Sequence, residues 1–111
     1  DGRYRYIVNL TPEATFQNVE TKSPLFKKWK SLAETDSHAK AMTTKYQHRP
    51  AIELYDVKND PYCMKNLAED AKQASTISRL DKELKRWMKD CGDEGQPTEM
   101  RAFEHMPGKR K

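Results

Sequence analysis

A short segment, residues 52 to 57, constrains the fold of this chain more than any other. Successive side chains of a β-strand point to opposite faces. Alternation therefore places three residues on each face: Ile52, Leu54 and Asp56 on one, and Glu53, Tyr55 and Val57 on the other. Apolar groups occur on both faces, which predicts a strand in the interior of a small sheet. Tyr4 to Val8 shows a similar alternation and is its predicted antiparallel partner.

The strand is followed by a turn and then by a long amphipathic helix. Asn59-Asp60-Pro61 predicts the turn, because Asn and Asp bond to nearby backbone and Pro fixes φ. The helix is predicted to run from Glu69 or Asp70 to Cys91, with Gly92 as its left-handed stop. Its apolar residues recur at steps of three and four: Ile77, Leu80, Leu84, Trp87 and Met88. This helix is predicted to cover the sheet, with Trp87 in the core.

Two shorter helices are predicted between the strands. Ser23-Pro24 is a typical helix start, a side-chain cap followed by Pro in the first turn. Apolar residues follow at helical spacing and are expected in the core: Leu25, Trp29 and Leu32. The second helix is expected from Ser37 to about Tyr46, because Pro50 forbids its continuation. The predicted fold class is α+β: a small antiparallel β-sheet packed against a long C-terminal helix, with two shorter helices inserted between the strands.

The ends of the chain carry two further predictions. Asp1-Gly2 is a signal for a tight hairpin turn, which predicts that the first arm of a hairpin is missing. The exposed edge of the strand over residues 4–8 is then expected to allow self-association. Residues 1–92 are predicted to form one subdomain, and residues 93–111 an extended tail, because Gly and Pro recur there without apolar periodicity.

Composition limits the classes of function. Hydrophobic residues make up 35% of the 111 residues and charged residues 34%, which predicts a single domain with a thin core. The net charge is +4, but acidic residues lie between the basic clusters, as on a mixed solvated surface. No nucleic-acid recognition motif accompanies the charge. No apolar run approaches the ~20 residues of a membrane span. We therefore expect neither a nucleic acid nor a membrane as partner.

The residues that carry chemistry form no catalytic motif. Cys63 and Cys91 allow one disulfide if the protein is exported, but zinc would need about four ligands at short spacing. There is no nucleophile elbow, no zinc-protease motif and no phosphate loop. Glu53 and Asp56 are explained by solvation at a strand edge or by a turn hydrogen bond. Asn9 begins a glycosylation sequon, which is expected to be a chance occurrence. The sequence predicts no catalytic residue and no metal site.

The order and spacing of one stretch identify a family resemblance. The sequence HRPAIELYDVKNDPY, from His48 to Tyr62, is followed by Asn66-Leu67-Ala68 and the long helix. It resembles the C-terminal subdomain of formylglycine-dependent sulfatases, in which "ELYDL-x-x-DP-x-E-x-x-NLA" precedes the last helix. The match is nearest in look to heparan N-sulfatase-like and bacterial glycan sulfatases. Cys63-Met64 departs from the family, which more often has Glu and an apolar residue there.

The resemblance implies a role for the chain within a larger enzyme. Neither cysteine lies in the family's C/S-x-P-S/A-x-R nucleophile motif, so this segment alone is expected to be inactive. Formylglycine and calcium are expected in the N-terminal catalytic domain of the parent, which is the expected partner. The segment would complete the fold and one rim of a cleft for a sulfated saccharide. The parent is expected to be exported: periplasmic, extracellular or lysosomal.

Two residues are candidates for substrate binding. His48 and Arg49 precede Pro50 where a loop enters the strand, and Arg can grip a sulfate through paired hydrogen bonds. Alternatively, Arg49 pins the loop to a carboxylate or carbonyl nearby. The alternative function for the whole chain is an independent basic α+β module that binds nucleic acid or another polyanion.

Overall fold

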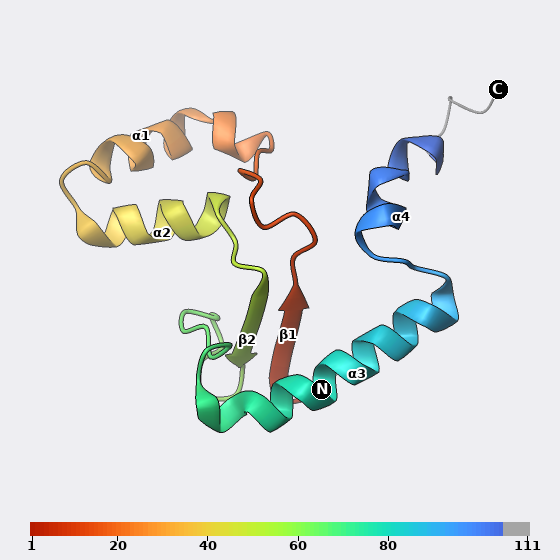
Figure 1. Cartoon of the computed structure of the whole chain (residues 1–111). Helices are drawn as coiled ribbons and strands as arrows, with labels where there is room; N and C mark the ends of the chain where they lie inside the picture. The colour runs from red at the N-terminus through yellow and green to blue at the C-terminus, as the bar shows by residue number, and fades with distance from the viewer. Residues whose placement is uncertain (106–111) are drawn as a thin grey trace. The chain divides into compact units, whose positions relative to one another are not determined.

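The computed structural model describes residues 1–105 and divides the chain into two compact units. The sheet unit comprises residues 1–10 and those from Ile52 onward. The helical unit comprises Thr11–Ala51, the segment inserted between the two strands. The predicted α+β class is confirmed: Figure 1 shows two strands, a long helix, and two shorter helices between the strands in chain order. The predicted boundary at residue 92 stays a prediction.

The sheet unit is built on two antiparallel strands, β1 (Tyr4–Val8) and β2 (Ile52–Asp56). Their register runs from Tyr4 opposite Asp56 to Val8 opposite Ile52, which confirms the predicted pairing. Within residues 1–105 the sheet has only these two strands, so the prediction of an interior position for β2 is wrong.

The second edge of β2 is covered by a loop instead of a strand. The N–H of Leu54 donates to Oδ1 of Asn66 at 3.0 Å, and its carbonyl accepts from the N–H of Leu67 at 2.8 Å. Nδ2 of Asn66 also donates to the Ile52 carbonyl at 3.2 Å. The loop thus takes the place of a third strand at this edge.

The core of the sheet unit is small and lies around β2. Leu54 is 0% exposed and Tyr55 is 1% exposed, although alternation directs them to opposite faces. Leu80, on the long helix, is the third buried apolar residue of this unit. The expectation of a thin core in which both faces of β2 are used is thus met.

The long helix, α3, runs over Ala74–Cys91 and is preceded by a 3-10 turn, Ala71–Gln73. Asp70 caps that turn by accepting the N–H of Lys72 at 3.0 Å. The α-helix therefore starts a turn later than predicted. Gly92 ends it with φ of 71°, the left-handed conformation predicted for this position.

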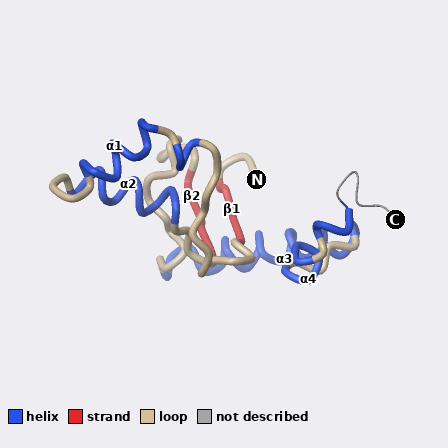
Figure 2. The backbone as a smooth tube through the Cα atoms, turned by 90° about the horizontal axis from the view of Figure 1, so that it is seen from above, coloured by secondary structure: helices blue, strands red, loops and turns tan. Residues whose placement is uncertain are grey.

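Trp87 does not lie in the core, and the prediction that it packs on the sheet is wrong. Its side chain is 61% exposed, whereas Leu80, seven residues earlier, is buried. A helix of 18 residues is about 27 Å long, but two strands lie only about 5 Å apart. The second half of α3 therefore extends past the strands, as both views of the chain show (Figures 1 and 2).

The helical unit is an antiparallel pair, α1 (Pro24–Leu32) and α2 (Ser37–Gln47). The Ser23 hydroxyl accepts the N–H of Phe26 at 3.1 Å, which confirms the predicted cap. Asp36 caps α2 in the same way, accepting the N–H of His38 at 2.9 Å. Figure 2 shows the two helices joined by a short turn.

The residue buried by α1 is not one of those predicted. Phe26 is 5% exposed and lies 5.4 Å from the ring of Tyr46, centroid to centroid. Trp29 is 49% exposed, and the other two predicted core residues of α1, Leu25 and Leu32, are also exposed. The predicted stripe begins at Leu25, but the residue that packs against α2 is the next one, Phe26.

Residues 93–105 are not an extended tail, so this prediction is wrong. They contain a short helix, α4 (Gln96–Met100), and a 3-10 turn, Ala102–His105. Gly95 precedes α4 with φ of 77°, and Pro97 occupies its first turn, where Pro needs no N–H partner. The rest of the predicted tail, 106–111, lies outside the described residues. None of the helices described is long and apolar enough to cross a membrane.

Asp1-Gly2 does not form the predicted left-handed hairpin turn. The glycines with positive φ among residues 1–105 are Gly92 and Gly95, not Gly2. Instead the Asp1 carboxylate accepts the N–H groups of Arg3, at 2.9 Å, and Tyr4, at 2.8 Å. The start of the chain thus folds against the beginning of β1.

Candidate functional site

The two residues predicted to bind substrate, His48 and Arg49, lie together just after the end of α2. The N–H of His48 donates to the Thr44 carbonyl at 2.8 Å, and its side chain is exposed. Nη1 of Arg49 donates to the Lys45 carbonyl at 3.1 Å. A cation at a helix C-terminus is favoured by the exposed carbonyls there. The contact of Arg49 is therefore the kind that the structural alternative predicted, and its role in substrate binding stays a prediction.

The buried carboxylate of the sheet unit belongs to Glu53, which sequence reasoning assigned to a solvated strand edge. Glu53 is 1% exposed, so that assignment is wrong. Its carboxylate accepts from Nδ2 of Asn9 at 2.8 Å and from the hydroxyl of Tyr55. A carboxylate placed between two donors is tolerated in a core because its lone pairs are bonded. No signal in the sequence marks Glu53 as buried, because its bonding partner Asn9 lies 44 residues away in the chain.

The bond to Glu53 also bears on the glycosylation sequon. The amide nitrogen of Asn9 that would carry a glycan is the atom that donates to the buried carboxylate. Glycosylation at this nitrogen would leave it one N–H and would place the sugar beside Glu53. The expectation that the sequon is a chance occurrence stays a prediction.

Asp56, the second carboxylate of β2, forms a turn and an ion pair. It lies 3.1 Å from the Arg3 guanidinium and accepts from Nδ2 of Asn59 at 2.9 Å. These hydrogen bonds, first that of Arg3 and then that of Asn59, lower the pKa of Asp56 below its ordinary value. The predicted turn hydrogen bond is confirmed. An ionised carboxylate held in this way cannot act as a general acid near neutral pH.

Tyr6 and Asp81 connect β1 to α3. The Tyr6 hydroxyl donates to Oδ1 of Asp81 at 2.9 Å, and Lys85 pairs with Oδ2 at 2.6 Å. Burial, and then the bond to Asp81, raises the pKa of Tyr6 to about 12. The bond from Lys85 is the main cause that lowers the pKa of Asp81. These bonds make the cluster a structural contact between β1 and α3.

The two cysteines are free thiols, so the disulfide that their number allows is not formed in this structure. Cys91 is exposed at the end of α3. Cys63 has a positive φ of 53° and lies 3.6 Å from the Arg5 guanidinium. Neither is followed by the residues of the formylglycine motif. Among the described residues, no group of three or more His, Cys, Asp and Glu could hold a metal ion.

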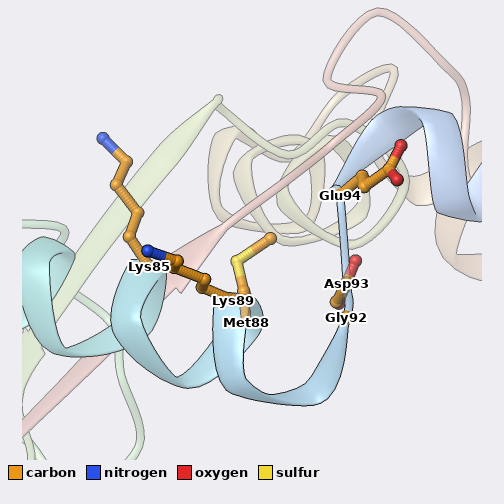
Figure 3. A pocket seen from close by; sticks show the side chains of 6 residues that line it. All are labelled: Lys85, Met88, Lys89, Gly92, Asp93 and Glu94. Atoms are coloured by element: carbon orange, nitrogen blue, oxygen red, sulfur yellow. The ribbon is translucent and has the colours of Figure 1, made fainter.

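An open cavity of about 460 Å³ lies at the end of α3 (Figure 3). It is lined by Lys85, Met88, Lys89, Gly92, Asp93 and Glu94. Its charges are mixed, and two are already paired elsewhere: Lys85 with Asp81, and Glu94 with Arg101 at 3.5 Å. The lining includes no nucleophile beside a base.

Comparison with known proteins shows which proteins this chain is similar to. No family model matches the chain. Two curated proteins of Formosa agariphila, each named as an ulvan-active sulfatase, are similar to it. One is 31% identical over 103 residues, which cover 89% of this chain, and the other is 33% identical over 94 residues, which cover 84%. The predicted resemblance to a sulfatase segment is confirmed.

The match covers most of this chain but only a small share of each relative. In both relatives the match takes up only 17% of the protein, so this chain spans about a sixth of their length. This chain is therefore similar to one part of each relative and not to its full length. The activity named for the two relatives is a property of proteins about six times as long.

Proposed function

We propose that this chain is a non-catalytic C-terminal part of a sulfatase that hydrolyses sulfated glycans. It completes the fold and forms one rim of the substrate cleft. The observation that carries the proposal is the similarity to two ulvan-active sulfatases over 84–89% of this chain. The order of the shared features supports it: the strand, the Asn-Asp-Pro turn and the long helix follow one another as in the family motif.

The other components of the enzyme lie in the rest of the parent chain in this proposal. The partner of the segment is the N-terminal catalytic domain. That domain supplies the formylglycine, whose hydrated aldehyde is the nucleophile, and calcium, which polarises the sulfate. The substrate is a sulfated saccharide, and the parent is exported. Nucleic acid and membrane are not partners.

Within the rim, His48 and Arg49 are the proposed contacts to the substrate. The exposed imidazole and the guanidinium follow the last turn of α2, two residues or fewer before Pro50. The bond from Nη1 to the Lys45 carbonyl orients the Arg49 guanidinium. A guanidinium suits a sulfate or carboxylate of a polyanionic sugar, because it carries five N–H groups in a fixed fork.

The first experiment compares the isolated chain with the full-length parent on an aryl sulfate and on sulfated oligosaccharides. The isolated chain is expected to show no hydrolysis above buffer background, with or without calcium. Metal-dependent turnover by the pure segment would contradict the proposal. Binding of the isolated chain to both DNA and heparin, lost at high salt, would favour the independent polyanion-binding module instead.

The second experiment tests the rim in the full-length parent. Arg49→Ala is expected to lower kcat/KM for sulfated saccharides about tenfold or more, while an aryl sulfate is affected little. Arg101→Ala is the control, because Arg101 is an exposed arginine of the sheet unit that pairs with Glu94. A thermal melt of each variant separates loss of the α2 cap from loss of a substrate contact. Equal losses on both substrates would place Arg49 among the structural residues.

A further inference from the structure

The outer edge of β1 presents backbone groups that no described residue pairs. In an antiparallel ladder, residues alternate between pairs that exchange hydrogen bonds and pairs that do not. The N–H and carbonyl of Leu54 bond to Asn66 and Leu67, away from β1. Tyr6, opposite Leu54, therefore directs its own N–H and carbonyl away from β2. The same holds for Val8, because the carbonyl of Ile52 opposite it bonds to Asn66.

One end of this edge is already occupied. The N–H of Tyr4 donates to the Asp1 carboxylate at 2.8 Å, and the terminal amino group of Asp1 donates to the Tyr4 carbonyl at 3.3 Å. Only Tyr6 and Val8 then keep outward groups without a partner among residues 1–105. In Figure 1, β1 is bordered by β2 on one side and by no strand on the other.

The two open residues are spaced so that a copy of the same segment can pair with them. Residues two apart on one strand edge point the same way, and an antiparallel copy presents them in the reverse order. Tyr6 then lies opposite Val8 of the second copy, and Val8 opposite its Tyr6. Each of these pairs exchanges two hydrogen bonds. Tyr4, whose outward groups bond to Asp1, lies opposite Leu10 of the second copy, so the backbone pairing is confined to Tyr6 and Val8.

We propose that the isolated chain forms a twofold dimer through the outer edge of β1, with Tyr6 opposite Val8 of the second copy. The result is a continuous four-stranded sheet, with the two β1 strands in its middle. Side chains agree with this alignment: Val8, which is 37% exposed, comes to lie beside Tyr6 of the second copy on the same face. Aromatic and β-branched residues are a favourable cross-strand pair. Ile7 lies opposite Ile7 across the twofold axis.

Charge sets how strongly the dimer forms. Each copy carries a formal charge of +4, so two copies repel each other, and this repulsion is screened by salt. The contact is also narrow, with two residues of each copy exchanging backbone bonds. We therefore expect a concentration-dependent equilibrium that shifts toward the dimer as the salt concentration rises. A contact between a basic and an acidic surface would respond in the opposite direction.

The test is sedimentation of the isolated chain over a range of concentrations, with Val8→Pro as the variant. Pro removes the outward N–H at residue 8 and leaves the bonds between β1 and β2 intact, since that N–H does not point toward β2. Two donors are lost per dimer, so the association constant should fall about tenfold or more. Val8→Thr is the matched control: it keeps the N–H and the β-branched shape, and should still dimerise.

A second measurement does not depend on any variant. Backbone hydrogen exchange at Tyr6 and Val8 of the unaltered chain should slow as the protein concentration rises, while exchange at exposed loop amides stays constant. A chain that remains monomeric at all concentrations overturns the proposal. So does a Val8→Pro chain that keeps its circular dichroism and associates as tightly as the unaltered chain. Slowed exchange at loop amides alone would place the dimer contact elsewhere and refute the pairing of β1.

Discussion

Replacing Asn66 by alanine tests whether a loop side chain completes the sheet. Asn66 makes three bonds: Oδ1 accepts the N–H groups of Leu54 and Ala68, and Nδ2 donates to the Ile52 carbonyl. These bonds are not equivalent, because Leu54 is fully buried whereas the bonds to Ala68 and Ile52 lie at exposed positions. The magnitude of the effect follows from this difference.

Water replaces an exposed hydrogen bond with little loss, but it does not reach a buried donor. An unsatisfied buried N–H costs about 1–3 kcal/mol, and each exposed bond contributes a few tenths. Asn66→Ala should therefore lower the free energy of unfolding of the sheet unit by about 2–3 kcal/mol. For a unit of this size that is a fall in Tm of about 10–20 °C. Natural domains have only about 5–15 kcal/mol in total, so the variant should be visibly destabilised.

The assay is urea unfolding followed by the fluorescence of Trp87, which lies in the sheet unit. Asn66→Asp separates the contributions, since it keeps the acceptor for Leu54 and loses the donor to Ile52; it should cost less than the alanine variant. Asn59→Ala removes an exposed side-chain bond to Asp56 and serves as the control. If Asn66→Ala unfolds at the same urea concentration as this control, Asn66 does not complete the edge of β2.

Two further predictions concern the contact of α3 with the sheet. Leu80→Ala should lower the free energy of unfolding by about 2–5 kcal/mol, because Leu80 is buried. Trp87→Ala should lower it by about 1 kcal/mol or less, because Trp87 is 61% exposed. Equal losses of the two variants in urea unfolding would contradict the observed position of the helix. The pKa of Tyr6 is raised from 10.0 to about 12, so its protonated form is favoured in the folded state. Its contribution to stability is complete below pH 10 and is lost as the pH rises toward about 12. Unfolding curves at pH 9 to 12 should show this loss for the unaltered chain and not for Tyr6→Phe, and the same slope in both would refute the role of the Tyr6 hydroxyl.

Local features of this fold were predictable from sequence because local chemistry determines them. Ser23 and Pro24 mark the start of α1, since a hydroxyl cap and a fixed φ need nothing beyond the next turn. Gly92 ends α3 for a similar reason, because a left-handed residue is strained unless it is glycine. The pairing of β1 with β2 follows from alternation, which both strands carry.

What the sequence did not predict depends on partners distant in the chain. Glu53 reads as a solvated carboxylate until Asn9 and Tyr55 are seen to bond to it in the core. Trp87 reads as core because helical periodicity gives the face of a helix but not how far its neighbour extends. The same limit explains Trp29, which lies on the apolar stripe of α1 but not at its contact with α2. For the candidate site, a bond from Arg49 to a nearby carbonyl was one of the alternatives, but its acceptor, Lys45, was not predicted.

The spacing of the strand-and-turn motif has a physical cause in this structure. Asp60 accepts the N–H groups of Met64 and Lys65, at 3.0 and 2.9 Å, and so folds the loop after the turn back on itself. That fold brings Asn66 to Leu54, twelve residues earlier, in the place of a third strand. Each bond joins a polar side chain to a backbone group at a fixed distance along the chain. One added residue between Asp60 and Asn66 would displace both sets of bonds, so the residues and their separations are required together. This requirement explains why the motif identifies the segment more specifically than its composition does.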